Sequence, residues 1–225
     1  MKRRALAGLL CLLLLGSLTP AGAEELKPGD RLFMGVYEQD NNPDNGPEPV
    51  EWLVLDAEEE RVLLLSRYCL ETRPFHSQPG VMQWDGCELR QWMNTEMLNA
   101  LFTPEEQERV LLTHLEALPH PRFTTDPGGE TDDRLFLLSI QEVAKYFTTK
   151  SARQARATKA ARAHGAYSSQ SGHCGWWLRT TGHSPEDEAR VSSLGTFVNY
   201  KVEYRKDTVR PAFWMKRDPE ESHAD

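Results

Sequence analysis

The sequence lacks the common signatures of catalytic and metal-dependent sites. It contains no Cys-x-x-Cys pair, which excludes zinc ribbons and thioredoxin-type redox sites. Its 7 histidines never show the i, i+4 spacing of a metalloprotease helix. It also has no glycine-rich phosphate loop and no Gly-x-Ser-x-Gly nucleophile elbow. The sequence therefore contains no recognisable active site.

Positive charge is scarce as well. Lysine and arginine number 26 against 34 aspartates and glutamates, for a net charge of −8. Such an acidic chain is a poor partner for nucleic acid, whose phosphates repel it, so we expect no nucleic-acid binding.

One segment departs from this acidic character, because a basic residue recurs there at every third position. Its members are Lys150, Arg153, Arg156, Lys159 and Arg162. On a helix of 3.6 residues per turn this spacing spirals around the axis and does not stay on one face. The segment is either an ordinary solvated surface or a contact for an acidic glycan or cell-wall polymer.

A long hydrophobic run occurs only at the N-terminus. Residues 5–18 are apolar, follow three basic residues at positions 2–4, and precede Ala21, Gly22 and Ala23, which form a small-residue cleavage site. This pattern predicts a signal peptide over residues 1–23 and a mature chain that begins at Glu24. A retained membrane anchor is the alternative, but the run is shorter than the roughly 20 residues that span a bilayer. We expect a secreted or envelope-associated protein with no membrane span after cleavage.

Cysteine is rare in the expected mature chain, which contains only Cys69, Cys87 and Cys174. Export exposes these thiols to oxidation, and an odd number allows one bridge with one thiol left free. We predict a Cys69–Cys87 disulfide, which would close a short loop and stabilise the fold by about 3 kcal/mol. The alternative is three unpaired, buried cysteines.

Local patterns predict an α+β fold with strands near both ends of the chain and helices in the middle. Apolar and aromatic runs predict strands over residues 31–37, 50–56, 61–67, 134–138, 175–179, 189–192, 196–200 and 209–215. Capping signals and helical spacing predict helices over residues 85–101, 103–112, 139–147 and 152–163. Residues 117–133 form a surface loop in this scheme. We expect one domain over residues 24–217 and an acidic, disordered tail over residues 218–225.

Oxygen-bearing side chains alternate in the loop that begins at Asp40. Asp40, Asn42 and Asp44 are followed by Glu51 at the twelfth position, as in a calcium-binding loop, although Gly46 is displaced from sixth to seventh place. The loop is either a calcium site or a turn held by side-chain bonds to its own backbone. We expect no other cofactor.

Two aromatic pairs lie in the predicted C-terminal strands, Trp176 with Trp177 and Phe213 with Trp214. Side chains alternate faces along a strand, so each pair should direct one ring inward and one outward. We expect Trp176, Trp177 and Trp214 to share one terminal sheet with Arg210, and this sheet to provide core stability.

An outward tryptophan would be a recognition residue. Trp176 together with Arg179, Tyr200 and Tyr204 could stack on a sugar ring or anchor a partner protein. Core packing is the competing explanation of the tryptophan.

Several short motifs occur in a family-specific order along the chain. They are Gly29-Asp30, residues 35–40, residues 48–55, residues 64–68, Trp84, residues 87–90, residues 92–94, residues 136–139, residues 176–179 and residues 209–214. These motifs resemble the bacterial domain of unknown function family 6273. The Trp-Trp-Leu-Arg and Val-Arg-Pro-Ala strands are also similar to the C-type-lectin-like fold of formylglycine-generating-enzyme-like and retroelement-diversified binding proteins.

The resemblance implies a C-type-lectin-like domain whose loops present a binding surface. Thr180-Thr181-Gly182 departs from the usual Ser-Pro-Gly of the family, and Ser193-Leu194-Gly195 lacks the common Asp-Gly turn. The oxidase relatives need a spaced catalytic cysteine pair, which Cys174 does not have. We therefore expect a secreted, non-catalytic domain that binds a glycan or a cell-surface protein. The alternatives are an exported enzyme of unrecognised chemistry and a structural envelope component.

Overall fold

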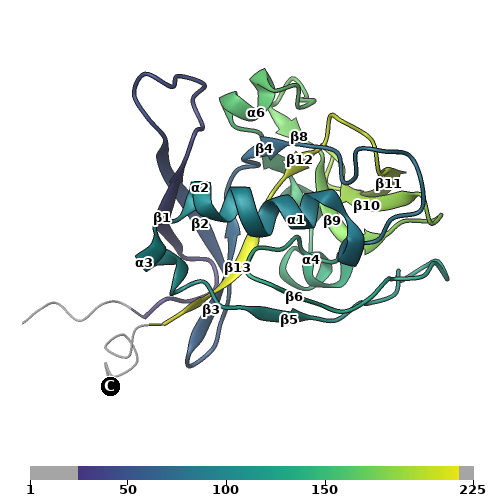
Figure 1. Ribbon diagram of the computed structural model, residues 1–225, viewed down its shortest axis with the longest axis horizontal. Helices are drawn as coiled ribbons and strands as arrows, with labels where there is room; N and C mark the ends of the chain where they lie inside the picture. The colour runs from purple at the N-terminus through teal and green to yellow at the C-terminus, as the bar shows by residue number, and fades with distance from the viewer. Residues whose placement is uncertain (1–24, 218–225) are drawn as a thin grey trace, which may run out of the picture.

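The computed structural model describes residues 25–217, so the predicted signal peptide, the cleavage site and the acidic tail lie outside the described residues. Two antiparallel-rich sheets and a few short helices make up an α+β fold (Figure 1). None of the described helices is both long and apolar enough to cross a bilayer.

The first sheet joins the two ends of the described chain. Its strands lie in the order β1 (Arg31–Tyr37), β2 (Glu48–Ala57), β3 (Arg61–Ser66) and β13 (Ala212–Lys216), all antiparallel. The first three form a meander of consecutive strands, and β13 returns from the far end of the sequence to pair with β3.

The second sheet is built from the C-terminal half of the chain and one early segment. Its order is β11 (Phe197–Lys201), β10 (Asp187–Val191), β9 (Trp176–Thr181), β12 (Thr208–Val209) and β4 (Glu71–Thr72). Strand β12 runs parallel to β9, and the other pairs are antiparallel. Two small ladders complete the strands, β5 (Thr113–Leu115) with β6 (Thr131–Asp133) and β7 (Ala155–Arg156) with β8 (His173–Cys174).

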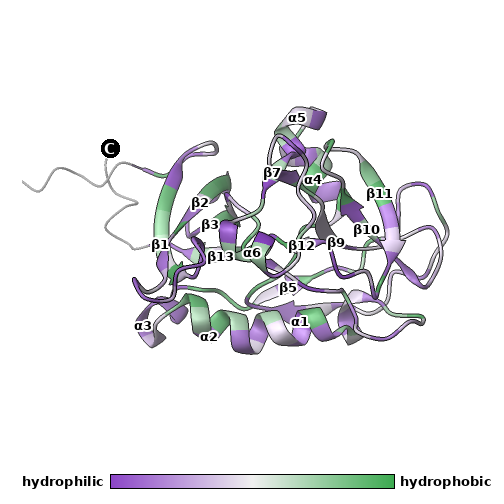
Figure 2. Cartoon of the chain, turned by 90° about the horizontal axis from the view of Figure 1, so that it is seen from above, coloured by the Kyte–Doolittle hydropathy of each residue, from purple (hydrophilic) through white to green (hydrophobic). Residues whose placement is uncertain are grey.

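A helical segment, interrupted only at the extended residue Cys87, packs against β1 at one end and β9 at the other. It comprises η1 (Trp84–Gly86), α1 (Glu88–Trp92), a π-helical turn η2 (Met93–Met97) and α2 (Leu98–Leu101). Figure 2 shows this segment running along both sheets, with the four-stranded sheet at one end and the five-stranded sheet at the other. The remaining helices are α3 (Pro104–Gln107), α4 (Ile140–Tyr146), α5 (Lys150–Arg153) and α6 (Lys159–Ala163), and α6 lies between the two sheets.

The prediction for the C-terminal aromatics is wrong in two respects. Trp176 and Trp177 belong to β9 in the second sheet, whereas Trp214 belongs to β13 in the first, and the chain changes sheet at Arg210. Both β9 tryptophans are also fully buried. The indole N–H of Trp176 donates to the Arg153 carbonyl in α5, and the indole N–H of Trp177 donates to the Arg73 carbonyl. Strand β9 is therefore covered on both faces.

Two helices are shorter than predicted. The helix expected over residues 103–112 ends at Gln107, and the one expected over 152–163 is divided into α5 and α6 by β7. The alanines between them favour a helix locally, but the backbone of Ala155 pairs with Cys174 instead. Residues 134–138 also form no full strand, because only Phe136 bridges to Ala212.

Candidate functional site

The four predicted recognition residues do not form one surface. Trp176 is fully buried and offers no surface to a ligand, so the prediction that its ring points outward is wrong. The side chain of Arg179 is 6% exposed and forms an ion pair with Glu142. Tyr200 and Tyr204 are brought together, with ring centroids 4.7 Å apart. Only this tyrosine pair remains of the predicted set.

The loop predicted to bind calcium does not include Glu51. That carboxylate lies in β2 and accepts hydrogen bonds from Arg31 and Arg67. The loop itself is closed by bonds such as that from the Asn45 amide to Asp40.

A different group of acids surrounds the loop. Carboxylate oxygens of Glu38, Asp40 and Glu48 lie within 4.8 Å of one another, so these residues could hold a cation. The sequence did not identify Glu48 as a cation ligand, because it lies on β2, beyond the loop that begins at Asp40. One of its oxygens accepts the backbone N–H groups of Gln39 and Asp40, which holds the loop against β2.

The predicted Cys69–Cys87 bridge is absent, since all three described cysteines are free and buried. Cys87 is the N-cap of α1, and its sulfur accepts the backbone N–H of Arg90. Cys69 instead neighbours Cys174, whose sulfur lies 3.4 Å from the hydroxyl oxygen of Thr208. Burial raises the pKa of Cys69, whereas the hydrogen bond from Cys69 lowers the pKa of Cys174.

The strongest candidate site was only partly anticipated from the sequence. No aspartate or glutamate occurs between Glu142 and Glu186, although this stretch contains seven lysines and arginines. The stretch includes the periodic basic residues at positions 150–162. That segregation of charge is a sequence signal, and within this acidic chain it concentrates positive charge on α5, β7 and α6.

Backbone hydrogen bonds fix three distant segments around one pocket. The N–H of Cys69 donates to the Arg156 carbonyl, and the N–H of Thr158 donates back to the Cys69 carbonyl. The N–H of Ala160 donates to the Gln39 carbonyl at 3.1 Å, which docks α6 on the loop after β1. Tyr68 is therefore held opposite the N-terminal end of α6.

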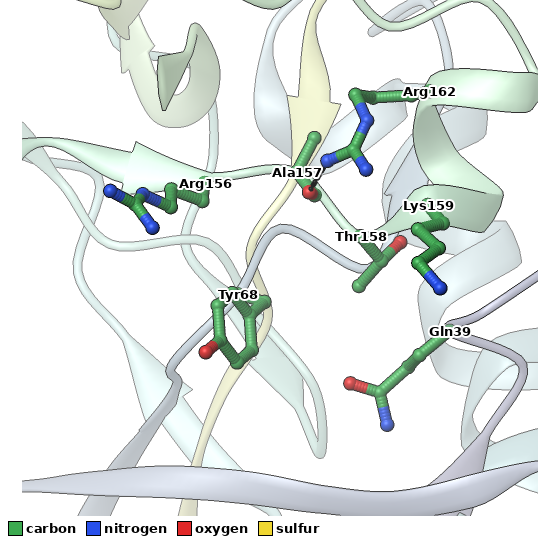
Figure 3. Close-up of a pocket in the computed structure, with 7 residues that line it drawn as sticks. All are labelled: Gln39, Tyr68, Arg156, Ala157, Thr158, Lys159 and Arg162. Carbon is green, nitrogen blue, oxygen red and sulfur yellow. Dashed lines mark hydrogen bonds between the residues drawn. The ribbon is translucent and has the colours of Figure 1, made fainter. Parts of the chain in front are cut away.

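The resulting cavity, called here the Tyr68 pocket, has a volume of about 250 Å³. Its lining residues are Gln39, Tyr68, Arg156, Ala157, Thr158, Lys159 and Arg162. Figure 3 shows Tyr68 opposite Gln39 and Lys159, with Thr158 between them. The lining thus combines three cationic side chains with one aromatic ring and contains no carboxylate, imidazole or thiol.

Some polar groups of the Tyr68 pocket are already used by the fold. Arg162 donates from Nη1 to the Ala157 carbonyl at 2.6 Å, and the Thr158 hydroxyl donates to the Leu70 carbonyl. By contrast, Lys159 and Arg156 are exposed and form no ion pair with any residue from 25 to 217. These two cations are available to a ligand.

This combination of groups suits an anion attached to a ring. Guanidinium and ammonium groups bind carboxylate or phosphate, and a tyrosine ring stacks on apolar or sugar surfaces. Among the lining residues, the exposed cations and the aromatic ring supply both kinds of contact.

Comparison with known proteins identifies a family but no characterised relative. No curated protein and no solved structure matches the chain. Residues 59–217 match the family described as Domain of unknown function (DUF6273). The match covers more than half of the sequence and confirms the resemblance to this family for the motifs within residues 59–217, so the chain belongs to the DUF6273 family.

Proposed function

We propose that this protein is a non-catalytic binding domain for an acidic glycan, which it holds at the Tyr68 pocket. The observation that carries the proposal is the concentration of unpaired positive charge around Tyr68 in a chain with a net charge of −8.

The charges of the pocket can contribute affinity only if they act together. A single exposed ion pair contributes about 0–1 kcal/mol, because water screens it. Arg156 and Lys159 together with stacking on Tyr68 would add several such contributions at one place. A neutral sugar would use only the ring, so the negative charge of the ligand provides the selectivity.

The predicted export supports a ligand of this class. The predicted signal peptide over residues 1–23 would place the domain outside the cytoplasm, where acidic glycans and cell-wall polymers occur. The similarity of two strand motifs to C-type-lectin-like proteins also favours a loop-borne binding surface, and we include that fold relationship in the proposal.

Isothermal titration calorimetry with defined oligomers tests this function. The purified protein is titrated with hexagalacturonate, which carries carboxylates, with a short poly(glycerol phosphate), which carries phosphates, and with uncharged maltohexaose. We expect at least one acidic oligomer to bind, with an affinity that falls as the salt concentration rises. Binding of maltohexaose as tightly as both acidic oligomers, or no binding of any of them, would contradict the proposal.

A further inference from the structure

A second basic pocket adjoins the first and is called here the Arg210 pocket. It has a volume of about 260 Å³ and lies between the first sheet and the β7–β8 ladder. Its cationic lining residues are Arg31, Arg67, Arg156 and Arg210, and the side chain of His173 also lines it. Tyr68 and Arg156 line both pockets, so the two cavities share a wall.

Arg210 is the least exposed of these cations, at 2%. Its Nε donates to the Ser66 carbonyl at 2.9 Å, and its guanidinium carbon lies 5.0 Å from the centre of the Trp176 ring. Nη1, however, has no hydrogen-bond acceptor among residues 25–217, and no carboxylate there pairs with this guanidinium. A buried guanidinium without a carboxylate partner is costly, and a bound anion would reduce that cost.

The other cations of the Arg210 pocket are only partly neutralised. Glu51 accepts from Arg67 at 2.5 Å and from Arg31 at 3.3 Å, so one carboxylate serves two guanidinium groups. Arg156 and Arg210 have no carboxylate partner in the described chain. The pocket therefore retains a surplus of positive charge.

Neither pocket is large. Both are smaller than the roughly 300–1,000 Å³ of cavities that enclose a drug-sized ligand. Each pocket has room for one charged group and the atoms next to it. A ligand that occupies both pockets must cross the wall that they share, which Tyr68 and Arg156 form.

We propose that the two pockets are adjoining subsites for one polyanionic chain, so that the ligand is an acidic polymer and not a single charged sugar. This inference rests on the proposed function and specifies its ligand. Simultaneous occupation makes the second contact intramolecular, so a chain that reaches both pockets binds more tightly than a fragment that reaches one.

Oligogalacturonates of different length test the inference by calorimetry. Galacturonate, digalacturonate and hexagalacturonate are titrated into the full protein and into three variants of equal charge change. Lys159→Gln alters only the Tyr68 pocket, and Arg31→Gln alters only the Arg210 pocket at a half-exposed side chain. Lys206→Gln removes an exposed cation that lines neither pocket and serves as the control. Circular dichroism and the melting temperature confirm that each variant is folded.

The hexamer should bind the unmodified protein at least about tenfold more tightly than the dimer. Each pocket variant should weaken hexamer binding at least about fivefold, because it removes one of two linked contacts. The control should stay within about twofold of the unmodified protein, as expected for an exposed charge outside the site.

Three results would overturn the inference. Equal affinity for dimer and hexamer would show a single subsite and would leave the proposed function standing. Loss of hexamer binding in only one of the two pocket variants would also show a single subsite, and it would leave the proposed function standing only if that variant is Lys159→Gln. Absence of binding for galacturonates of every length and for poly(glycerol phosphate) would remove the proposed function together with the polymer subsites.

Discussion

Arg190 and Asp207 form an ion pair inside the second sheet, where Gly175 leaves room for it. The side chain of Asp207 is 1% exposed, and that of Arg190 is 12% exposed. The guanidinium carbon of Arg190 also lies 3.8 Å from the centre of the Tyr200 ring. The buried pair thus supports one of the few exposed tyrosines, and the absence of a side chain at Gly175 permits both interactions.

Gly175→Ala should disrupt this ion pair. A Cβ at position 175 would overlap a carboxylate oxygen of Asp207 and would lie 2.6 Å from Nη1 of Arg190. Breaking a buried pair costs about 3–5 kcal/mol, and chemical denaturation should show a loss of this order. Gly86→Ala is the matched control, because its Cβ would meet only the Met82 sulfur at 3.4 Å. Equal stability of the two variants would show that the pair can move without cost.

Glu188→Gln should change how stability depends on pH. Glu188 is fully buried, both its oxygens lack partners among the described residues, and burial raises its pKa well above 4.5. The folded state therefore retains a proton that the unfolded chain releases. The proton's contribution to the free energy of unfolding is therefore fully present below about pH 4.5. As the pH rises from there towards the folded-state pKa, the free energy of unfolding falls by up to about 1.4 kcal/mol per pH unit.

Urea denaturation between pH 6.5 and 8.5 checks this prediction. The range lies above the pKa of Asp207, which burial raises to about 6 and which contributes with the same sign at lower pH. The unmodified protein should lose more stability than Glu188→Gln as the pH rises. The exposed Glu59→Gln variant should follow the unmodified protein, and identical slopes in all three would refute the buried-carboxyl explanation.

Trp177→Ala should be much more destabilising than Trp214→Ala. The Trp177 ring is fully buried, packs against Phe75 at 5.9 Å and donates its N–H to a backbone carbonyl, so its removal should cost about 3–5 kcal/mol. Trp214 is half-buried beneath the guanidinium of Arg61, which lies 4.2 Å from the ring centre, so replacing it removes less buried apolar area. Equal losses in denaturant titrations would contradict the assignment of Trp177 to the core.

Thiol titration should find three free groups in the chain that begins at Glu24. Cys69, Cys87 and Cys174 are unpaired and fully buried, so they should react slowly in the native protein and completely in guanidinium chloride. A reduced sample provides the control and should give the same three equivalents. A single reactive thiol before reduction would instead indicate a disulfide.

Local patterns were sufficient where neighbouring residues determine the structure. The capping boxes at Thr103 and Ser139 form as predicted, with hydroxyl and glutamate each bonded to the other residue's backbone. The strand over Arg31–Tyr37 also has the predicted bounds. In these segments, side-chain spacing and capping chemistry agree with the tertiary environment.

Where the predictions failed, backbone pairing between residues distant in the sequence determined the structure. The Ala-rich segment has strong helix propensity, but its Ala155 pairs with Cys174 and its Ala157 bridges to Cys69, which interrupts the helix. The same contacts bring Tyr68 to Arg156 across a long stretch of sequence. The spacing of residues along the chain does not show that these distant segments meet. The absence of aspartate and glutamate between Glu142 and Glu186, however, does indicate the positive charge of the site.

The affinity of Arg156→Gln for hexagalacturonate tests anion binding at this site most directly, because Arg156 lines both pockets and is exposed. Calorimetry is carried out beside Lys206→Gln, which removes the same charge from an exposed residue that lines neither pocket. We predict that Arg156→Gln weakens binding about tenfold or more, as for loss of a charged hydrogen bond of about 1.5–3 kcal/mol, while Lys206→Gln binds as the unmodified protein does. Equal affinities of both variants and the unmodified protein would contradict binding of an acidic glycan at the Tyr68 pocket.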